Sequence, residues 1–79
     1  MAKQVKLSEL SIGQKGMIIK FDNEISQIKL MEMGCLPGEL VSIENIALLG
    51  CPMVIRVSGY LLSLRKSEAS SIWVEVNNA

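Results

Sequence analysis

Residues 30–38 read Leu30-Met31-Glu32-Met33-Gly34-Cys35-Leu36-Pro37-Gly38, and a helical pattern ends within them just before an alternating pattern begins. Gly34 suits the position past a helix end, because a residue without a Cβ atom adopts the left-handed backbone conformation there at no cost. Pro37 and Gly38 then complete a turn. After this turn the apolar residues fall at every second position, which is the period of strands with one buried face. The sequence therefore predicts one helix set into a small, mainly β fold.

The stretch from Met53 to Leu64 predicts a β-hairpin with a defined register. A two-residue turn at Ser58 and Gly59 would bring the apolar residues of both strands onto one face. The facing pairs would be Val57 with Tyr60, Ile55 with Leu62, and Met53 with Leu64. On the opposite face Arg56 would lie beside Leu61 and Val54 beside Ser63. Because this register buries the apolar residues of both strands at once, we expect it to form.

The other expected elements are short. We expect a helical turn or loop at 7–10, a strand at 17–21, a helix at 24–33 capped by Asp22 or Asn23, a helical turn within 65–71 and a last strand at 72–76. Alternation in the last strand buries Ile72, Val74 and Val76 and turns Trp73 and Glu75 outward. About five short strands that close on one another would leave no exposed sheet edge. We therefore expect a small barrel with one inserted helix.

The expected helix carries apolar residues on more than one face. At 100° per residue, Ile25, Ile28 and Met31 form one stripe, whereas Leu30 and Met33 lie well round to the other side. We expect the barrel to wrap enough of the helix to bury both sets. The alternative is that one edge of the helix faces a partner.

The same motifs carry a resemblance to a known family. They are Leu30-Met31-Glu32-Met33-Gly34 followed by Leu36-Pro37-Gly38, then Leu49-Gly50-Cys51-Pro52, Ile55-Arg56-Val57 and Gly59-Tyr60-Leu61-Leu62-Ser63-Leu64-Arg65. In this order and spacing the chain resembles the ferrous iron transport protein A (FeoA) family from about Leu7 to Val76. The resemblance implies a small cytosolic SH3-like barrel that works beside a membrane-embedded ferrous iron transporter carrying its own GTPase domain. One position departs from the family, which usually has an acidic residue where this chain has Cys51.

The length and the charge of the chain exclude several classes of function. Seventy-nine residues predict one domain, residues 1–79, with a core too thin to enclose a deep substrate pocket easily. Eight basic and eight acidic residues, spread without a basic run, argue against binding to nucleic acid or to an anionic membrane. The longest nearly apolar run, 46–55, is half of the ~20 residues that a membrane-spanning helix needs, and the first residues lack the apolar core of a signal peptide. We therefore expect a cytoplasmic protein that is a monomer or a weak homo-oligomer.

The sequence offers little for catalysis. It has no histidine, which removes the usual general base and the commonest metal ligand, and it has no glycine-rich phosphate loop. We therefore expect no enzyme activity and no cofactor. Cys35 and Cys51 are sixteen positions apart, unlike a compact chelate, and supply two soft ligands where a closed tetrahedral site needs four. We assign them no metal, and a small thiol-based metal-binding or metal-sensing protein is the alternative function.

Apolar residues that strand alternation leaves outside form the candidate partner-binding site. Leu48 and Leu49 fall in a connection between strands, and Leu61 and Trp73 face away from the core, with Arg56 opposite Leu61. Exposed apolar residues that gather into one patch mark binding sites, and Trp and Arg are often at the energetic centre of such sites. Two alternatives stand beside this hypothesis: the loop leucines could fold back over an open barrel end, or the outer edge of the helix around Leu30 and Met33 could make the contact.

Composition and periodicity predict only a compact, non-catalytic interaction module. The resemblance to the FeoA family implies that this module is a cytosolic accessory protein of ferrous iron uptake. The resemblance implies that it binds the cytosolic side of the GTPase-containing transporter and is peripheral to the inner membrane through that partner. A similar barrel ends some metal-dependent repressors, but a repressor also needs a helix-turn-helix, for which 79 residues filled by the barrel leave no room.

Overall fold

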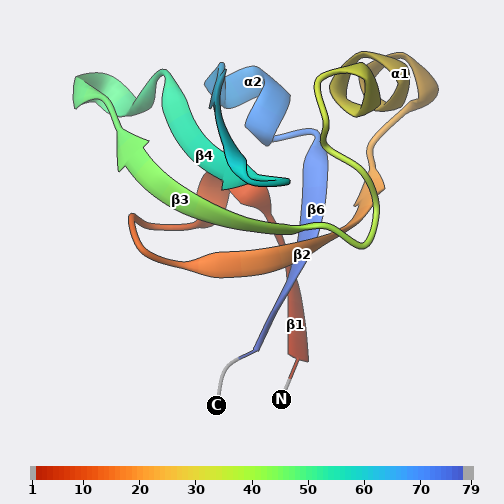
Figure 1. The fold of residues 1–79 in the computed structure, drawn as a ribbon, viewed down its shortest axis with the longest axis horizontal. Coiled ribbons are helices and arrows are strands. Elements are labelled where there is room, and N and C mark those ends of the chain that lie inside the picture. The colour runs from red at the N-terminus through yellow and green to blue at the C-terminus, as the bar shows by residue number, and fades with distance from the viewer. Residues whose placement is uncertain (1, 78–79) are drawn as a thin grey trace.

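The computed structural model describes residues 2–77, which form one strongly bent antiparallel sheet with short helices at its margins (Figure 1). The strands are β1 (Ala2–Lys6), β2 (Lys15–Phe21), β3 (Leu40–Ile46), β4 (Met53–Val57), β5 (Tyr60–Leu64) and β6 (Ile72–Asn77). The helices are α1 (Glu24–Glu32) and α2 (Lys66–Ala69), with the single-turn 3-10 helices η1 (Leu7–Glu9) and η2 (Leu48–Gly50). The expectation of a mainly β fold with one substantial helix is confirmed. None of the helices in this part of the chain is both long enough and apolar enough to cross a membrane.

Within residues 2–77 the sheet has six strands in the order β1-β6-β2-β3-β4-β5, one more than the number expected. The additional strand is β1, in which only Ala2 and Val5 are apolar, so its sequence shows no alternation. Pairing with β6 holds it in place, with Val5 opposite Val74 and Lys6 opposite Trp73. The expected closure without edges is wrong, because β1 and β5 end the order and each pairs with a single strand among the described residues.

The β4–β5 hairpin has the predicted register. The facing pairs are Met53 with Leu64, Val54 with Ser63, Ile55 with Leu62, Arg56 with Leu61, and Val57 with Tyr60. Ser58 and Gly59 have φ angles of +52° and +84°, and two positive φ angles are what the tight turn favoured by the twist of a hairpin requires. Met53, Ile55 and Val57 of β4 are at most 2% exposed, so the predicted inner face of β4 lies at the centre of the core. The expected burial on β5 is wrong in part, because Tyr60 is 45% exposed and Leu62 is only partly buried beside the open edge of the sheet.

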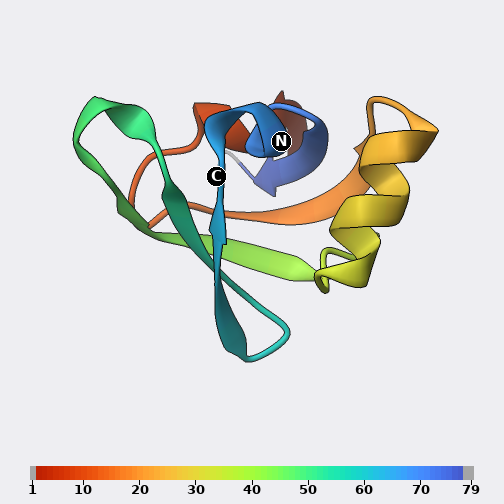
Figure 2. The same cartoon turned by 90° about the horizontal axis from the view of Figure 1, so that it is seen from above.

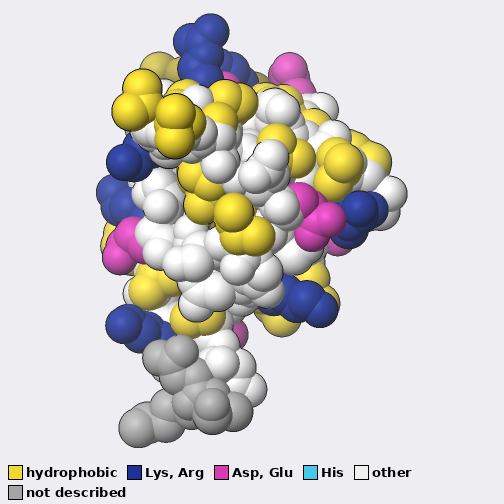
Figure 3. All heavy atoms as spheres, turned by 90° about the vertical axis from the view of Figure 1, so that its left-hand side faces the viewer, with side chains coloured by type: hydrophobic (Ala, Val, Ile, Leu, Met, Phe, Trp, Pro, Cys, Tyr) yellow, Lys and Arg dark blue, Asp and Glu magenta, His cyan; other side chains and the backbone are white. Residues whose placement is uncertain are grey.

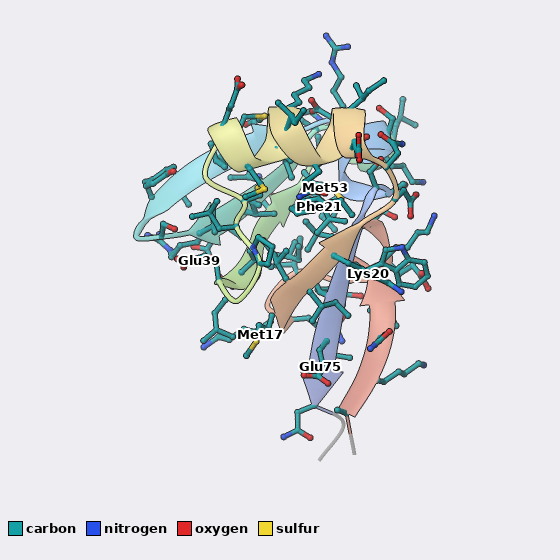
Figure 4. All side chains as sticks on the ribbon, turned by 90° about the vertical axis from the view of Figure 1, so that its right-hand side faces the viewer. Met17, Lys20, Phe21, Glu39, Met53 and Glu75 are labelled. Carbon is teal, nitrogen blue, oxygen red and sulfur yellow. The ribbon has the colours of Figure 1, made fainter. Side chains whose placement is uncertain are left out.

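The alternation predicted for β6 is also confirmed. Ile72, Val74 and Val76 are at most 8% exposed, whereas Trp73 and Glu75 are partly exposed on the opposite face. Beneath α1, Phe21 and Met53 extend this core from β2 and β4 (Figure 4).

The helix α1 is only partly buried, so the expectation that both of its apolar stripes are covered is wrong. Leu30 is 1% exposed, but Ile25 is 83% exposed and Ile28 is 61% exposed. The physical reason is that α1 lies at one end of the sheet, beside the end of β2 and the start of β3, rather than across a face of it (Figure 2). An ion pair of 3.0 Å between Lys29 and Glu68 fastens the helix to α2.

The sequence indicated the residues at both ends of α1, and a contact with Tyr60 further fixes its C-terminal end. At the start, the side-chain oxygen of Asn23 accepts the Ser26 N–H at 2.8 Å. At the end, Gly34 has a φ of +106°, and a Cβ atom at this position would collide with the hydroxyl of Tyr60. That hydroxyl donates to the carbonyl of Met33 at 3.2 Å. The end of the helix is thereby joined to the β4–β5 hairpin.

Candidate interaction surfaces

The η2 connection between β3 and β4 presents two almost fully exposed leucines. Leu48 is 91% exposed and Leu49 is 96% exposed. The connection lies at the upper left of the bent sheet in Figure 1, and Figure 3, which views that side, shows hydrophobic side chains standing out near its top. The alternative that these leucines fold back over the core is therefore wrong. Both side chains are free to be buried by another molecule.

The backbone of this connection holds Leu49 in a conformation that leucine disfavours. Its φ is +75°, in the left-handed region, where a residue with a Cβ atom is strained by about 1–2 kcal/mol. The turn is fixed by hydrogen bonds from the Gly50 N–H to the Ala47 carbonyl at 2.8 Å and from the Ala47 N–H to the Pro52 carbonyl at 3.1 Å. Glycine or asparagine would suit position 49 better for folding alone. Neither the backbone conformation nor burial favours leucine at this position for folding.

Arg56 and Leu61 form a second surface, on the outer face of the β4–β5 hairpin. They face each other in the register, and Leu61 is 52% exposed. The Arg56 guanidinium donates to one carboxylate oxygen of Glu44 through Nε at 3.3 Å and Nη2 at 3.2 Å. This ion pair is partly exposed and adds little to stability, but it neutralises the charge of Arg56 beside Leu61.

Trp73 lies on a third surface, the outer face of β1, β6 and β2. It is the register partner of Lys6 and of Lys20, and each of these ammonium groups is 5.4 Å from the centre of the indole ring. The indole N–H donates to Asp22 at 2.8 Å, and this bond, with Lys6 at 3.4 Å, holds the pKa of the Asp22 carboxyl below its usual value. Figure 4 shows Lys20 projecting from this side of the molecule. Trp73 therefore links three neighbouring segments of the chain.

The structure does not bring the five predicted site residues into one patch. Leu48 and Leu49 precede β4, whereas Arg56 and Leu61 lie at its far end beside the hairpin turn. Trp73 belongs to the other half of the sheet order. The η2 leucines are the most accessible of the five, and Trp73 is the one most engaged with its own chain.

Two further apolar surfaces are exposed. One is an edge of α1, but it carries Ile25 and Ile28, the stripe that the sequence analysis expected in the core. The alternative contact around Leu30 and Met33 is wrong, because Leu30 is 1% exposed. The other surface is the pair Met17 and Leu40, which face each other across β2 and β3 and are 38% and 64% exposed. They border a solvent-open hollow of about 450 Å³. The register of β2 shifts between Ile18 and Lys20, so simple alternation does not predict which face Met17 occupies.

The two cysteines lie in different environments. Cys35 is fully buried beside the end of α1, whereas Cys51 is exposed after η2. Burial, with a smaller contribution from Glu68, raises the pKa of the Cys35 thiol to about 11. This thiol is protonated at neutral pH, and metal binding requires the thiolate. Within residues 2–77 no three Cys, Asp or Glu side chains are grouped so that they could hold a metal ion.

Comparison with known proteins adds to this geometry. The model of the FeoA domain family matches residues 5–76. Over 73 residues the chain is 30% identical to the Fe(2+) transport protein A/Fe(2+) transporter FeoB fusion protein of Porphyromonas gingivalis, a match that covers 91% of this chain and 9% of the fusion protein. The chain therefore spans a small part of that relative.

Two solved structures share the fold. The NMR structure of a FeoA-like protein from Clostridium acetobutylicum has a TM-score of 0.90 and 41% identity, covering all of this chain and 93% of that one. The zinc complex of FeoA from Stenotrophomonas maltophilia, described as a prokaryotic SH3 domain protein, has a TM-score of 0.75 and 25% identity, covering 95% of this chain and 99% of that one. The SH3-like fold expected from the sequence is confirmed.

Proposed function

The chain belongs to the FeoA domain family, and we propose that it is a non-catalytic accessory protein of ferrous iron uptake. It binds the cytosolic side of a GTPase-containing ferrous iron transporter and is peripheral to the membrane through that contact. We further propose that residues 1–79 act as one domain, as a monomer or weak homo-oligomer, and that the Leu48–Leu49 pair is the centre of the contact.

The P. gingivalis relative supports the choice of partner. There, a region similar to this chain belongs to the same polypeptide as an Fe(2+) transporter. Covalent attachment raises the effective concentration of one part near the other, so even a weak contact between them is occupied. In our proposal, a separate protein makes the corresponding contact without the covalent link.

The exposed pair Leu48 and Leu49 is the single observation that carries the contact. Burying a leucine side chain contributes about 1.5–3 kcal/mol, so the pair offers a substantial part of the binding energy of a modest interface. Association itself costs at least about 4 kcal/mol, so additional contacts are needed. Leu61 and the neutralised Arg56 on the hairpin can supply some of them, while Trp73 lies on a different surface.

A metal-carrying role has less support from the geometry. The S. maltophilia FeoA structure is a zinc complex, but that observation belongs to a protein 25% identical to this chain. Here Cys35 is buried with a raised pKa and Cys51 is exposed on a separate connection. A site built on both thiols would require rearrangement of the core around Cys35.

The proposal is tested by ferrous iron uptake in cells that lack this protein. Leu49→Asn is the main variant, because asparagine tolerates the left-handed conformation and removes the apolar side chain without straining the turn. We expect Leu49→Asn, and more strongly Leu48→Asp with Leu49→Asn, to fold normally and to lose most of the uptake that the wild-type protein restores.

Ile25→Asn provides the matched control. Ile25 is also a highly exposed apolar residue, but it lies on α1 and away from η2. Uptake restored by Ile25→Asn and not by the η2 variants supports the proposed contact. If the η2 variants restore uptake fully and Ile25→Asn does not, the contact is the exposed edge of α1 and the assignment to Leu48 and Leu49 is wrong.

A further inference from the structure

The two edges of the sheet are protected very differently. β1 carries Lys3 and Lys6 among its five residues, and charged side chains on an edge prevent other strands from pairing with it. β5 has the sequence Tyr60-Leu61-Leu62-Ser63-Leu64, without charge or proline, and it pairs with β4 without a register shift. A regular, uncharged edge of this kind is suited to the addition of another strand.

The backbone of β5 also has hydrogen-bonding groups on its open side. In a hairpin closed by a two-residue turn, Val57 and Tyr60 exchange hydrogen bonds, and such pairs recur at every second residue. Leu62 is therefore bonded to β4, whereas the N–H and C=O groups of Leu61 and Ser63 point away from it. Within residues 2–77 the structure records no protein partner for these four groups. An added strand would find donors and acceptors already in the correct geometry.

The side chains along this edge define the chemistry of the occupant. On the outer face stands Leu61, beside an Arg56 whose charge Glu44 neutralises. On the inner face stand Tyr60, 45% exposed, and the partly buried Leu62. A charged side chain on an added strand would lose its hydration here, and no unpaired charge of opposite sign on this edge would compensate for that loss. The edge therefore fits an extended, uncharged segment that is apolar on both faces.

From these observations we infer that β5 receives an extended, uncharged, apolar segment of the transporter's cytosolic side as an additional strand. This inference rests on the proposed function and specifies how the partner is bound. A strand of about five residues forms few hydrogen bonds, which suits a segment held close by other contacts, such as those of Leu48 and Leu49. A second copy of this chain is the competing occupant, and the experiment separates the two.

The direct test is residue-resolved amide hydrogen exchange of the full chain, alone and with the full-length transporter of the same organism in lipid nanodiscs. In the free protein the amides of Leu61 and Ser63 should exchange rapidly and that of Leu62 slowly. Binding of the transporter should slow Leu61 and Ser63 at least about tenfold, because each amide gains a hydrogen bond. Protection that appears when the concentration of the protein alone is raised would assign the edge to a second copy and overturn the inference.

Two variants separate the failure of this inference from the failure of the proposed function. Ser63→Pro removes a donor on the open side and keeps the hydrogen bonds between β4 and β5, while Ser63→Thr keeps the donor as a matched control. We expect Ser63→Pro to weaken transporter binding about tenfold and Ser63→Thr to leave it unchanged. Leu61→Lys places a charged residue on β5, as Lys3 and Lys6 do on β1, and it should weaken binding by a similar factor. This variant keeps the test possible if Ser63→Pro does not fold. If Ser63→Pro and Leu61→Lys fold and bind the transporter normally, the inference about β5 is wrong and the proposed function still stands. If the wild-type protein does not bind the transporter, the proposed function is wrong.

Discussion

The inner face of the β4–β5 hairpin and the η2 connection both consist of apolar residues, but the first is buried and the second is exposed to solvent. Ile55 and Val57 are at most 1% exposed, whereas Leu48 and Leu49, only a few residues earlier, are 91% and 96% exposed. Hydrophobicity does not distinguish the two regions. The backbone does, because a regular strand turns every second side chain to the core while the left-handed residue in η2 turns its side chain to solvent. Substitutions in the two regions should therefore separate stability from binding.

The largest effect is expected in the core. Ile55→Ala should lower the free energy of unfolding by about 2–5 kcal/mol, because it removes buried methyl groups and leaves a cavity. Chemical denaturation followed by circular dichroism measures the loss. A change below about 1 kcal/mol would mean that the hairpin's inner face is not the centre of the core, and the contrast with η2 would fail.

The junction between α1 and the hairpin should be nearly as sensitive. Gly34→Ala combines a positive φ with a collision against the Tyr60 hydroxyl, and we expect a loss of about 2–4 kcal/mol. Gly38→Ala is the matched variant, since Gly38 also has a positive φ, +92°, but has open space where a Cβ atom would stand. Its cost should be only about 1–2 kcal/mol. Equal losses for the two variants in thermal and denaturant unfolding would contradict the contact between Gly34 and Tyr60.

The buried thiol predicts a dependence of stability on alkaline pH. Cys35 has a pKa of about 11 in the folded protein against an ordinary value of 9.0, so the unfolded chain releases this proton first. The stabilisation is complete below pH 9 and is lost as the pH rises from 9 through 11. Urea unfolding across this range should show a steeper decline for the wild-type protein than for Cys35→Ala, in which this thiol is absent. Identical slopes would show that the pKa of Cys35 is not raised.

Thiol labelling extends the same comparison to the surface. Cys51 is exposed and should react with a thiol reagent in the folded protein, whereas Cys35 should react only after unfolding. Mass spectrometry of the labelled protein distinguishes one modification from two. Rapid modification of Cys35 under native conditions would contradict its burial.

The sequence predicted regular elements well and surfaces poorly, for identifiable physical reasons. The register of β4 and β5 follows from alternation on both strands and a Ser58-Gly59 turn, all of which are local in the sequence. β1 carries no such signal, because its stability comes from pairing with the distant β6. The exposure of Ile25 was mispredicted because it depends on where α1 lies against the sheet, which no local pattern specifies.

For the candidate site, too, local patterns predicted some features, whereas features that depend on contacts between distant residues were not predicted. Alternation correctly placed Leu61 and Trp73 on outer faces, and the loop position of Leu48 and Leu49 correctly indicated the surface. These sequence patterns could not show that the predicted site residues lie on three separate surfaces. They also could not show that Lys6, Lys20 and Asp22 surround Trp73. Those contacts join residues up to 67 positions apart and appear only when the sheet is assembled.

Of the substitutions considered, Leu49→Asn should change folding stability least and transporter binding most. The most direct measurement is the affinity of the wild-type protein and of Leu49→Asn for the full-length ferrous iron transporter in nanodiscs, with thermal unfolding of both proteins recorded under the same conditions. We predict at least about a tenfold weaker affinity for Leu49→Asn, with a stability equal to or slightly above that of the wild-type protein, because a buried apolar contact is lost and backbone strain is relieved. Equal affinity of two equally stable proteins would contradict the assignment of the transporter contact to the η2 leucines.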